Sequence, residues 1–339
     1  MKRFFTHFLL PSLVVTLGFA FQPLEVPPLF ATDELIEITL STDLETYAKD
    51  RYGTPEYRPA KLSYKWQGVT YEAKAEIQAR GRFRRDICDL PPIKLKVKKK
   101  SRIDLFEGQK SLKVVSECRQ DNNQSVLREY YIYKAYNLFT EKSMRVRLLR
   151  LTLVDTKGKR PDQTSYAFFI EDDDAMAERV GATKVSKSVD LTNEDVDRNQ
   201  QTLVHVFNYM IANRDFGVDI RQNVEVITGG SGGRPVVVPY DFDNSGMVNA
   251  PYTKPPGDTK SAYVTRRDFK ALCRSEEEFQ AVFTKFVEKR DEIIAMYENS
   301  PYLSPETVKE SLKYYKIFYK TLKKKKSMAE IFRKACNPE

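Results

Sequence analysis

The segment "AKLSYKWQGVTYEAKAEIQARG", residues 60–81, alternates apolar and polar side chains with a period of two. This alternation is typical of β-strands that bury one face, because successive side chains of a strand point to opposite sides. The same alternation recurs in the first half of the chain, in the segments 34–42, 91–100, 111–117, 143–159 and 164–174. We therefore expect half-buried antiparallel strands there.

Helical spacing interrupts these strands once. Between Gln124 and Lys142, apolar residues recur on one helical face, namely Leu127, Tyr131, Ile132, Ala135 and Leu138. The second half is mainly helical. Its pattern predicts a long helix at about 197–213, short strands at "NVEVI" and "PVVVPYD" joined by "TGGSGG", and further helices beyond Thr265, one of them capped by Ser304.

The order of these elements predicts an α+β fold with two lobes. We assign residues 30–170 to a strand-rich N-lobe and residues 171–339 to a mainly helical C-lobe that carries the acidic loops described below. With 339 residues and 41% hydrophobic content, the chain is long and apolar enough to form a substantial core.

The N-terminus has the layout of a secretory signal peptide. Lys2 and Arg3 precede an apolar run, and small residues at Gly18 and Ala20 predict cleavage after residue 20. The alternative is an uncleaved membrane anchor, but Pro11 breaks the run and the run is short for a span. Residues 1–20 are therefore expected to be removed, which places the protein outside the cell or in the cell envelope.

Export makes the four cysteines candidates for disulfide bonds. Two lie in each half of the chain, so we expect the pairs Cys88–Cys118 and Cys273–Cys336. The alternative is four buried thiols.

The histidine content excludes several kinds of catalysis. The chain has two histidines, and His7 leaves with the signal peptide. The chain therefore lacks the residues that zinc sites and most Ser-His or Cys-His hydrolases need. His205 lies in an apolar helix, where we expect a packed core histidine. Catalysis here would depend on carboxylates, lysines and a metal ion.

The formal charge is +9, and two basic stretches, residues 94–102 and 320–326, contribute to it. Solvated charge is the simpler interpretation. The functional one is peripheral contact with acidic surfaces, such as acidic glycans, lipid headgroups or acidic proteins. Export argues against a nucleic-acid partner.

Two acidic stretches carry the chemistry. Phosphoryl transfer needs a carboxylate that positions the attacking hydroxyl, and oxygen ligands that hold Mg²⁺ against the phosphates. In protein kinases, an Asp, an Asn about five residues later and a second Asp after a hairpin supply them. Asp215, Asn223 and Asp241 keep this order, with Asp243 close behind, although the first interval is longer. The alternative is that both stretches are solvated acidic loops.

These motifs resemble the CotH kinase family, a group of atypical kinases associated with secretion and spore coats. The similar stretches are an Arg-Gly segment with a lysine-containing strand, a strand ending in Glu, a catalytic loop, and a proline-aromatic-Asp-aromatic-Asp end. In this chain they read "ARGRFRRDICDLPPIKLKV", "YAFFIED", "NRD" with the later Asn223, and "VVVPYDFDNSG". The last match is the most specific. The resemblance covers most of the chain after the signal peptide and implies a two-lobed, atypical protein-kinase-like fold.

The resemblance also implies roles for the acidic residues. Asp215 would be the catalytic residue, while Asn223 and either Asp241 or Asp243 would hold Mg²⁺ or Mn²⁺.

It implies roles for the N-terminal half as well. Lys94 or Lys96, which share one face of their strand, would contact the phosphates of ATP, and Glu129 would steady that lysine. The alternative for these three is a basic surface strand and a solvated helix face. Arg80 and Arg84 either bind phosphate or pair with Asp86 and Asp89. Glu171 would mark the junction of the lobes, where we expect its side chain to be structural.

The function implied is an exported, ATP-dependent kinase that transfers phosphate to hydroxyls of secreted or envelope proteins. Two alternatives stay open. One is an inactive, pseudokinase-like binding or assembly module of the cell envelope, and the other is an enzyme that transfers AMP instead of phosphate.

Overall fold

The computed structural model describes residues 27–101, 104–119, 124–230, 232–254, 263–270, 272–324 and 331–332. The predicted signal peptide, residues 1–20, lies outside the described residues, and so does Cys336. The predictions that concern them, cleavage after residue 20 and the Cys273–Cys336 pair, therefore stay predictions.

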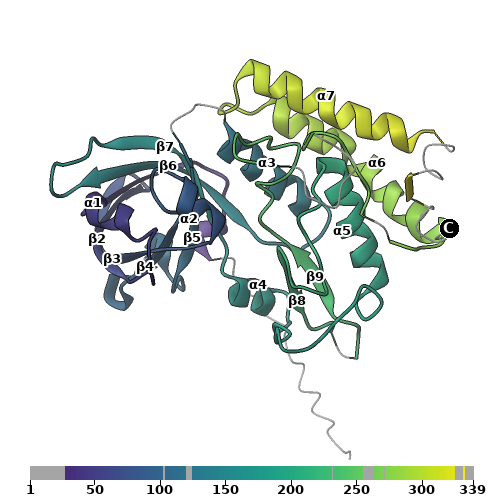
Figure 1. Cartoon of the computed structure of the whole chain (residues 1–339), viewed down its shortest axis with the longest axis horizontal. Helices are drawn as coiled ribbons and strands as arrows, with labels where there is room; N and C mark the ends of the chain where they lie inside the picture. The colour runs from purple at the N-terminus through teal and green to yellow at the C-terminus, as the bar shows by residue number, and fades with distance from the viewer. Residues whose placement is uncertain are drawn as a thin grey trace, which may run out of the picture.

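The strands of the first half form a closed barrel, in the order β1-β2-β3-β4-β5-β7-β6. It lies at one end of the molecule, in purple to teal in Figure 1. The strands are β1 (Ile36–Thr42), β2 (Arg58–Trp66), β3 (Val69–Ala79), β4 (Ile93–Val97), β5 (Leu112–Ser116), β6 (Val146–Asp155) and β7 (Gln163–Ile170). Most neighbours in the barrel are antiparallel, as expected, but β1 and β6 pair in parallel and close it.

The expected two-lobed, protein-kinase-like fold with a strand-rich N-lobe and a helical C-lobe is therefore wrong. The strands close into a barrel because Ile36–Thr42 pairs with Leu149–Asp155, a segment far along the chain. A period-two pattern predicts which face of a strand is buried, but not which strand lies next to it. Helices are also spread along the chain, since α1 (Leu44–Lys49), α2 (Phe83–Ile87) and α3 (Ser125–Asn137) lie between the strands.

The remaining elements include the predicted helices and hairpin of the second half, and also a short helix at 173–179 and 3₁₀ turns that the sequence patterns did not predict. They are the helices α4 (Asp173–Arg179), α5 (Arg198–Ile211), α6 (Glu276–Glu298) and α7 (Pro305–Leu322), the hairpin strands β8 (Val224–Ile227) and β9 (Val236–Pro239), and the 3₁₀ turns η1 (Pro28–Phe30), η2 (Lys99–Ser101) and η3 (Asp104–Phe106). The expected cap is confirmed, because the Ser304 side chain accepts a hydrogen bond from the Thr307 amide.

Two apolar cores meet at the barrel wall. Ala167 and Phe169 of β7 point into the core of the barrel. Phe168 and Ile170, on the other face of the same strand, join the core that includes α3, α5, α6 and α7. The outer face of β5, β6 and β7 is thus the surface on which the helices pack, and Figure 1 shows α3 against it.

The disulfide Cys88–Cys118 is confirmed. It joins the residue after α2 to the loop that follows β5, and the Asp89 amide donates to the Cys118 carbonyl across the same junction. The α2 segment is therefore fastened to the end of β5. Among the described residues, no helix combines the length and the apolar character needed to cross a membrane.

Candidate active site

A cleft with charged walls lies between the outer face of the barrel and the β8–β9 hairpin. Its volume is about 220 Å³, below the roughly 300 to 1,000 Å³ of typical small-molecule pockets. The cleft is therefore suited to a charged part of a ligand more than to a whole nucleotide. One wall is acidic and comes from the segments around residues 215, 223 and 241–244, and the other is basic and comes from residues 80–84 and β5.

The hairpin brings the acidic residues together. Val224 pairs with Pro239 in the β8–β9 register, and the Tyr240 amide donates to the Asn223 carbonyl over 3.0 Å. This pairing folds the chain back on itself, so that Asp241 lies beside Asn223 although 17 residues lie between them in the sequence. The sequence alone gave only the order of these residues. Asp215, Asn223, Asp241 and Asp243 all line the same cleft.

Asp215 is held from both sides. Its Oδ1 accepts from Gln222 Nε2 over 3.1 Å, and its Oδ2 accepts from Asn244 Nδ2 over 2.8 Å. Its backbone amide donates to the side chain of Asn213, and its carbonyl accepts from Asn223 Nδ2 over 2.8 Å. These amide donors fix the orientation of the carboxylate. Because Asn223 Nδ2 donates to the Asp215 carbonyl, the side-chain oxygen Oδ1 is the atom that Asn223 can offer to a ligand.

Two residues of the acidic wall have left-handed backbone conformations. The φ angles are +49° at Asn223 and +60° at Asp241. Asn and Asp tolerate this region better than other non-glycine residues, but it remains costly. The Asp241 amide donates to the buried Tyr133 hydroxyl over 2.8 Å, which helps to hold the turn. Backbone strain of this kind is concentrated at functional sites.

The loop after Asp243 depends on a glycine. A Cβ at Gly246 would lie 2.4 Å from the Val264 carbonyl oxygen and 2.7 Å from the Thr265 Cα. The Gly246 amide donates to the Ala212 carbonyl at the end of α5. Close backbone approach thus sets the position of the "DFDNSG" turn relative to the loop that carries Asp215.

Buried like charges distinguish the acidic wall. Asp243 is 5% exposed and Glu129, on α3, is 2% exposed. Burial raises the pKa of Asp243 to about 7, and the negative charge of Asp241 adds to the shift. Burial also raises the pKa of Glu129 well above its usual range, with Asp243 and Asp241 adding to it. The charged forms of these two carboxyl groups are therefore disfavoured relative to those of exposed carboxyl groups.

The basic wall offers cations to an anionic ligand. Arg80, Arg84 and Lys113 line the cleft. Arg84 donates to the Ser116 carbonyl over 2.6 Å and lies over the ring of Tyr252, whose hydroxyl donates to Asp243 Oδ2 over 3.2 Å. Lys113 lies over the ring of Tyr240 and forms a 3.2 Å ion pair with Asp173.

No protein-family model matches the chain. No curated protein matches it either. The resemblance to the CotH kinase family therefore stays a prediction that rests on the motifs alone.

The predicted lysines are not the cations that line the cleft. Neither Lys94 nor Lys96 is among its lining residues. Lys96 forms a 3.8 Å ion pair with Glu76 and lies over the ring of Tyr57. Lys94 is in register with Lys113 on the neighbouring strand, and it is Lys113 that reaches the cleft.

Glu129 has a different environment from the one expected. It does not line the cleft, but it lies within electrostatic range of Asp243, Asp241, Arg84 and Arg80. No ion pair between Glu129 and a lysine is present among the described residues. Its electrostatic neighbours are thus acidic and basic residues of the two walls.

Sequence reasoning missed several residues of the cleft, namely Lys113, Tyr133, Gln222, Tyr240 and Asn244. A signal was present for two of them. Lys113 is the cation of "SLKVVSE", and strand alternation places it opposite the apolar residues that enter the barrel. Asn244 directly follows the most specific motif. Tyr133, Gln222 and Tyr240 can be assigned to the cleft only from the positions of α3 and the hairpin in the structure.

The acidic wall offers oxygen atoms of the kind that bind divalent cations. Asp241 and Asp243 supply carboxylates, Asn223 supplies an amide oxygen, and the buried Oε1 of Glu129 has no hydrogen-bond partner among the described residues. Within the described part of the chain, no three acidic, His or Cys side chains converge closely enough to form a metal site by themselves. The protein would share the ion with water and phosphate oxygens, as is usual for Mg²⁺.

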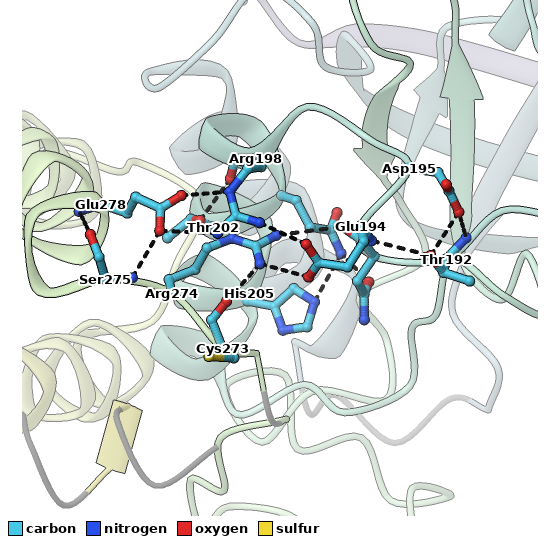
Figure 2. Close-up of polar contacts among 12 residues, drawn as sticks. Thr192, Glu194, Asp195, Arg198, Thr202, His205, Cys273, Arg274, Ser275 and Glu278 are labelled. Carbon is cyan, nitrogen blue, oxygen red and sulfur yellow. Dashed lines mark hydrogen bonds and ion pairs between the residues drawn. The ribbon is translucent and has the colours of Figure 1, made fainter. Parts of the chain in front are cut away.

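A second polar cluster, away from the cleft, joins the starts of α5 and α6 (Figure 2). Arg198 pairs with Glu194 and Glu278 at 2.6 and 2.7 Å, and the buried Arg274 pairs with Glu194 at 3.0 Å. Ser275 and Glu278 form a capping box at the start of α6. We interpret this cluster as structural.

His205 lies beside that cluster and is 3% exposed. Its Nδ1 donates to the Lys270 carbonyl over 2.9 Å, which leaves Nε2 to accept from Gln201. Burial lowers the pKa of His205 to about 4. The expected packed core histidine is confirmed.

Glu171 is also structural. Its carboxylate forms a two-armed ion pair with Arg179, both arms at 2.9 Å, and accepts from the Arg145 amide. Its side chain is 3% exposed.

Proposed function

We propose that the protein is a metal-dependent phosphotransferase that moves the γ-phosphoryl group of ATP to a hydroxyl of an exported or envelope protein. One observation carries the proposal, which is that Asp215, Asn223, Asp241 and Asp243 face basic side chains across a single cleft. The cleft supports the proposal and the fold does not, because function depends on the site more than on the fold that carries it.

Asp215 is the group that receives the proton of the attacking hydroxyl. Gln222 and Asn244 hold one carboxylate oxygen each, so the carboxylate is oriented before a substrate arrives. The bond that forms joins the acceptor oxygen to the γ-phosphorus, and the bond that breaks joins that phosphorus to the β–γ bridging oxygen of ATP. ADP leaves with the electron pair of that bond, and the proton passes to Asp215.

The basic wall binds the phosphates. Arg80, Arg84 and Lys113 supply positive charge along it, and the Asp173 ion pair limits the positions that Lys113 can adopt. Asn223, Asp241 and Asp243 would hold Mg²⁺ or Mn²⁺, which when bound neutralises phosphate charge. Positioning and charge neutralisation are the main contributions that proteins make to this reaction.

The test compares two aspartates of one loop. Asp215→Asn should lower phosphate transfer from radiolabelled ATP by roughly 10² to 10⁴-fold, the usual contribution of a positioned acid or base. Asp219→Asn is the control, because Asp219 is exposed and does not line the cleft. Both variants should keep the increase in melting temperature that ATP with Mn²⁺ gives the wild-type protein.

The alternatives predict other results. If wild-type protein binds ATP with Mn²⁺ but transfers no phosphate to itself or to any candidate protein of the cell envelope, the binding-module interpretation replaces this proposal. If mass spectrometry finds AMP on the product, the enzyme is an AMP transferase. Equal activity of Asp215→Asn and wild type would show that Asp215 is not the catalytic residue.

A further inference from the structure

A segment outside the cleft, residues 263–270, contacts both of the loops that hold Asp215. The first loop carries Gln222 and the second carries Asn244, and the side-chain amide of each donates to one carboxylate oxygen of Asp215. None of residues 263–270 is among those that line the cleft. Any effect of this segment on Asp215 therefore passes through the two loops.

Two side-chain contacts fasten the segment to the first loop, one on each side of Asp215. Arg214 Nη1 donates to Asp268 Oδ2 over 3.1 Å. The Lys270 ammonium donates to the Phe216 carbonyl and lies 5.1 Å from the centre of the Phe216 ring. Both sequence neighbours of Asp215 are thus held by residues of one short segment.

The contact made by Lys270 continues to an amide that orients Asp215. Gly217, the residue after Phe216, exchanges two backbone hydrogen bonds with Gln222, at 2.9 and 3.0 Å. Gln222 Nε2 in turn donates to Asp215 Oδ1. A donor that fixes the Phe216 carbonyl therefore also fixes the backbone from which the Gln222 side chain extends.

The start of the segment packs against the second loop. A Cβ at Gly246 would lie 2.4 Å from the Val264 carbonyl oxygen, and Asn244 lies two residues before that glycine. The segment is itself anchored to α7, because the Tyr314 hydroxyl donates to the Thr265 carbonyl over 2.6 Å. Residues 263–270 thus tie both amide-bearing loops to a long helix.

We infer that Lys270 is a positioning residue for Asp215, and the part that concerns catalysis rests on the proposed function. Lys270 lies outside the cleft, so it acts through the loop and not on the substrates. It keeps the Asp215 carboxylate in one orientation before they arrive. A displacement of about 1 Å at a reacting group can lower a rate by about 10²-fold. Lys270 should therefore affect the rate of phosphate transfer and not the affinity for ATP.

Kinetic constants of the full chain with ATP and Mn²⁺ test this role. Lys270→Met removes the donor and keeps an unbranched side chain, and it should lower kcat by roughly tenfold to hundredfold while KM for ATP stays within about twofold. Lys270→Arg keeps a donor and should restore most of kcat. In the Asp215→Asn background, Lys270→Met should lower kcat no further, because residues that act as a unit are not additive. Arg266→Met, which removes an exposed cation from the same segment, should leave kcat unchanged.

Hydrogen–deuterium exchange tests the same contact without substrate. The backbone amides of Gly217 and Gln222 should exchange roughly tenfold faster in Lys270→Met, the change expected when a hydrogen bond to a charged group is lost. In Arg266→Met they should exchange at the wild-type rate.

Unchanged exchange at these two amides would overturn the inference, as would a further loss of kcat in the Asp215→Asn background. Faster exchange across the whole chain would assign Lys270 to general stability and would also overturn it. A wild-type protein that transfers no phosphate would instead refute the proposed function, and the exchange rates would still decide whether Lys270 holds the loop.

Discussion

Individual titratable residues show how burial sets charge in this protein. The same physical cause acts in opposite directions on Asp243 and His205, because burial disfavours the charged form of each. It raises the pKa of Asp243 to about 7 and lowers the pKa of His205 to about 4. Asp243 lies in the cleft, where a cation would offset the cost. His205 lies in the core and stays neutral.

His205 should therefore make the protein less stable in acid. Its folded pKa of about 4 is below its ordinary value of 6.5, so the unfolded chain binds more protons between these values. Stability from the neutral imidazole is complete above pH 6.5 and is lost as pH falls toward 4. The loss should reach about 3 kcal/mol, at 1.36 kcal/mol per pKa unit.

Urea unfolding at pH 7, 6, 5 and 4.5 measures this effect. The carboxylates titrate equally in wild type and His205→Gln, so the difference between the two proteins isolates the histidine. The free energy of unfolding of wild type should fall more steeply with acid than that of the variant. Parallel curves would mean that the imidazole is solvated in the folded protein.

At the scale of elements, ion pairs differ in importance with burial. The pair Glu171–Arg179 fastens the end of β7 to α4, and its side chains are 3% and 11% exposed. The pair Lys61–Glu72 links β2 to β3, and its side chains are 57% and 61% exposed. A buried charge that loses its partner has no water to replace it, whereas an exposed one does.

Glu171→Gln should lower the free energy of unfolding by up to about 3 to 5 kcal/mol, because it leaves the buried Arg179 guanidinium with the exposed Glu141 as its charged partner. Glu72→Gln, the same change on the barrel surface, should cost no more than about 1 kcal/mol. Chemical denaturation of the two variants with wild type gives both values. Similar costs would show that the β7–α4 junction is open to water.

At the scale of the whole molecule, the barrel and the helices share a wall. The outer face of β5, β6 and β7 belongs to the core of the helical part, while their inner face belongs to the core of the barrel. Neither core is complete without these strands. The cleft lies at the same wall, so the relative position of its acidic and basic sides depends on this packing.

The two parts should therefore unfold together. Trp66, the only tryptophan of the chain, packs against the barrel core, so its fluorescence reports the barrel. Circular dichroism at 222 nm reports mainly α5, α6 and α7. The two signals should give one coincident urea transition. A separate, earlier loss of helical signal would show that the barrel is stable alone.

The acidic residues of the cleft could be found from sequence, because Asp215, Asn223, Asp241 and Asp243 belong to a local unit. A helix end, a short hairpin and the turn after it place them within one stretch of chain. On the basic wall, Arg80 and Arg84 were also candidates from the sequence, but Lys113 was not. Lys94 and Lys113 carry the same charge on adjacent strands, and only the packing of the barrel wall against the hairpin brings Lys113 to the cleft.

By itself, the sequence determined the type of most elements and the acidic side of the cleft. These depend on side-chain periodicity, capping and short turns, which act between residues close together in the chain. Only the tertiary structure decided three features. These are the parallel pairing of β1 with β6 that closes the barrel, the position of Lys113 instead of Lys94 in the cleft, and the burial of Glu129 behind the cleft. Each of these depends on contacts between segments far apart in the sequence, and local patterns do not specify such contacts.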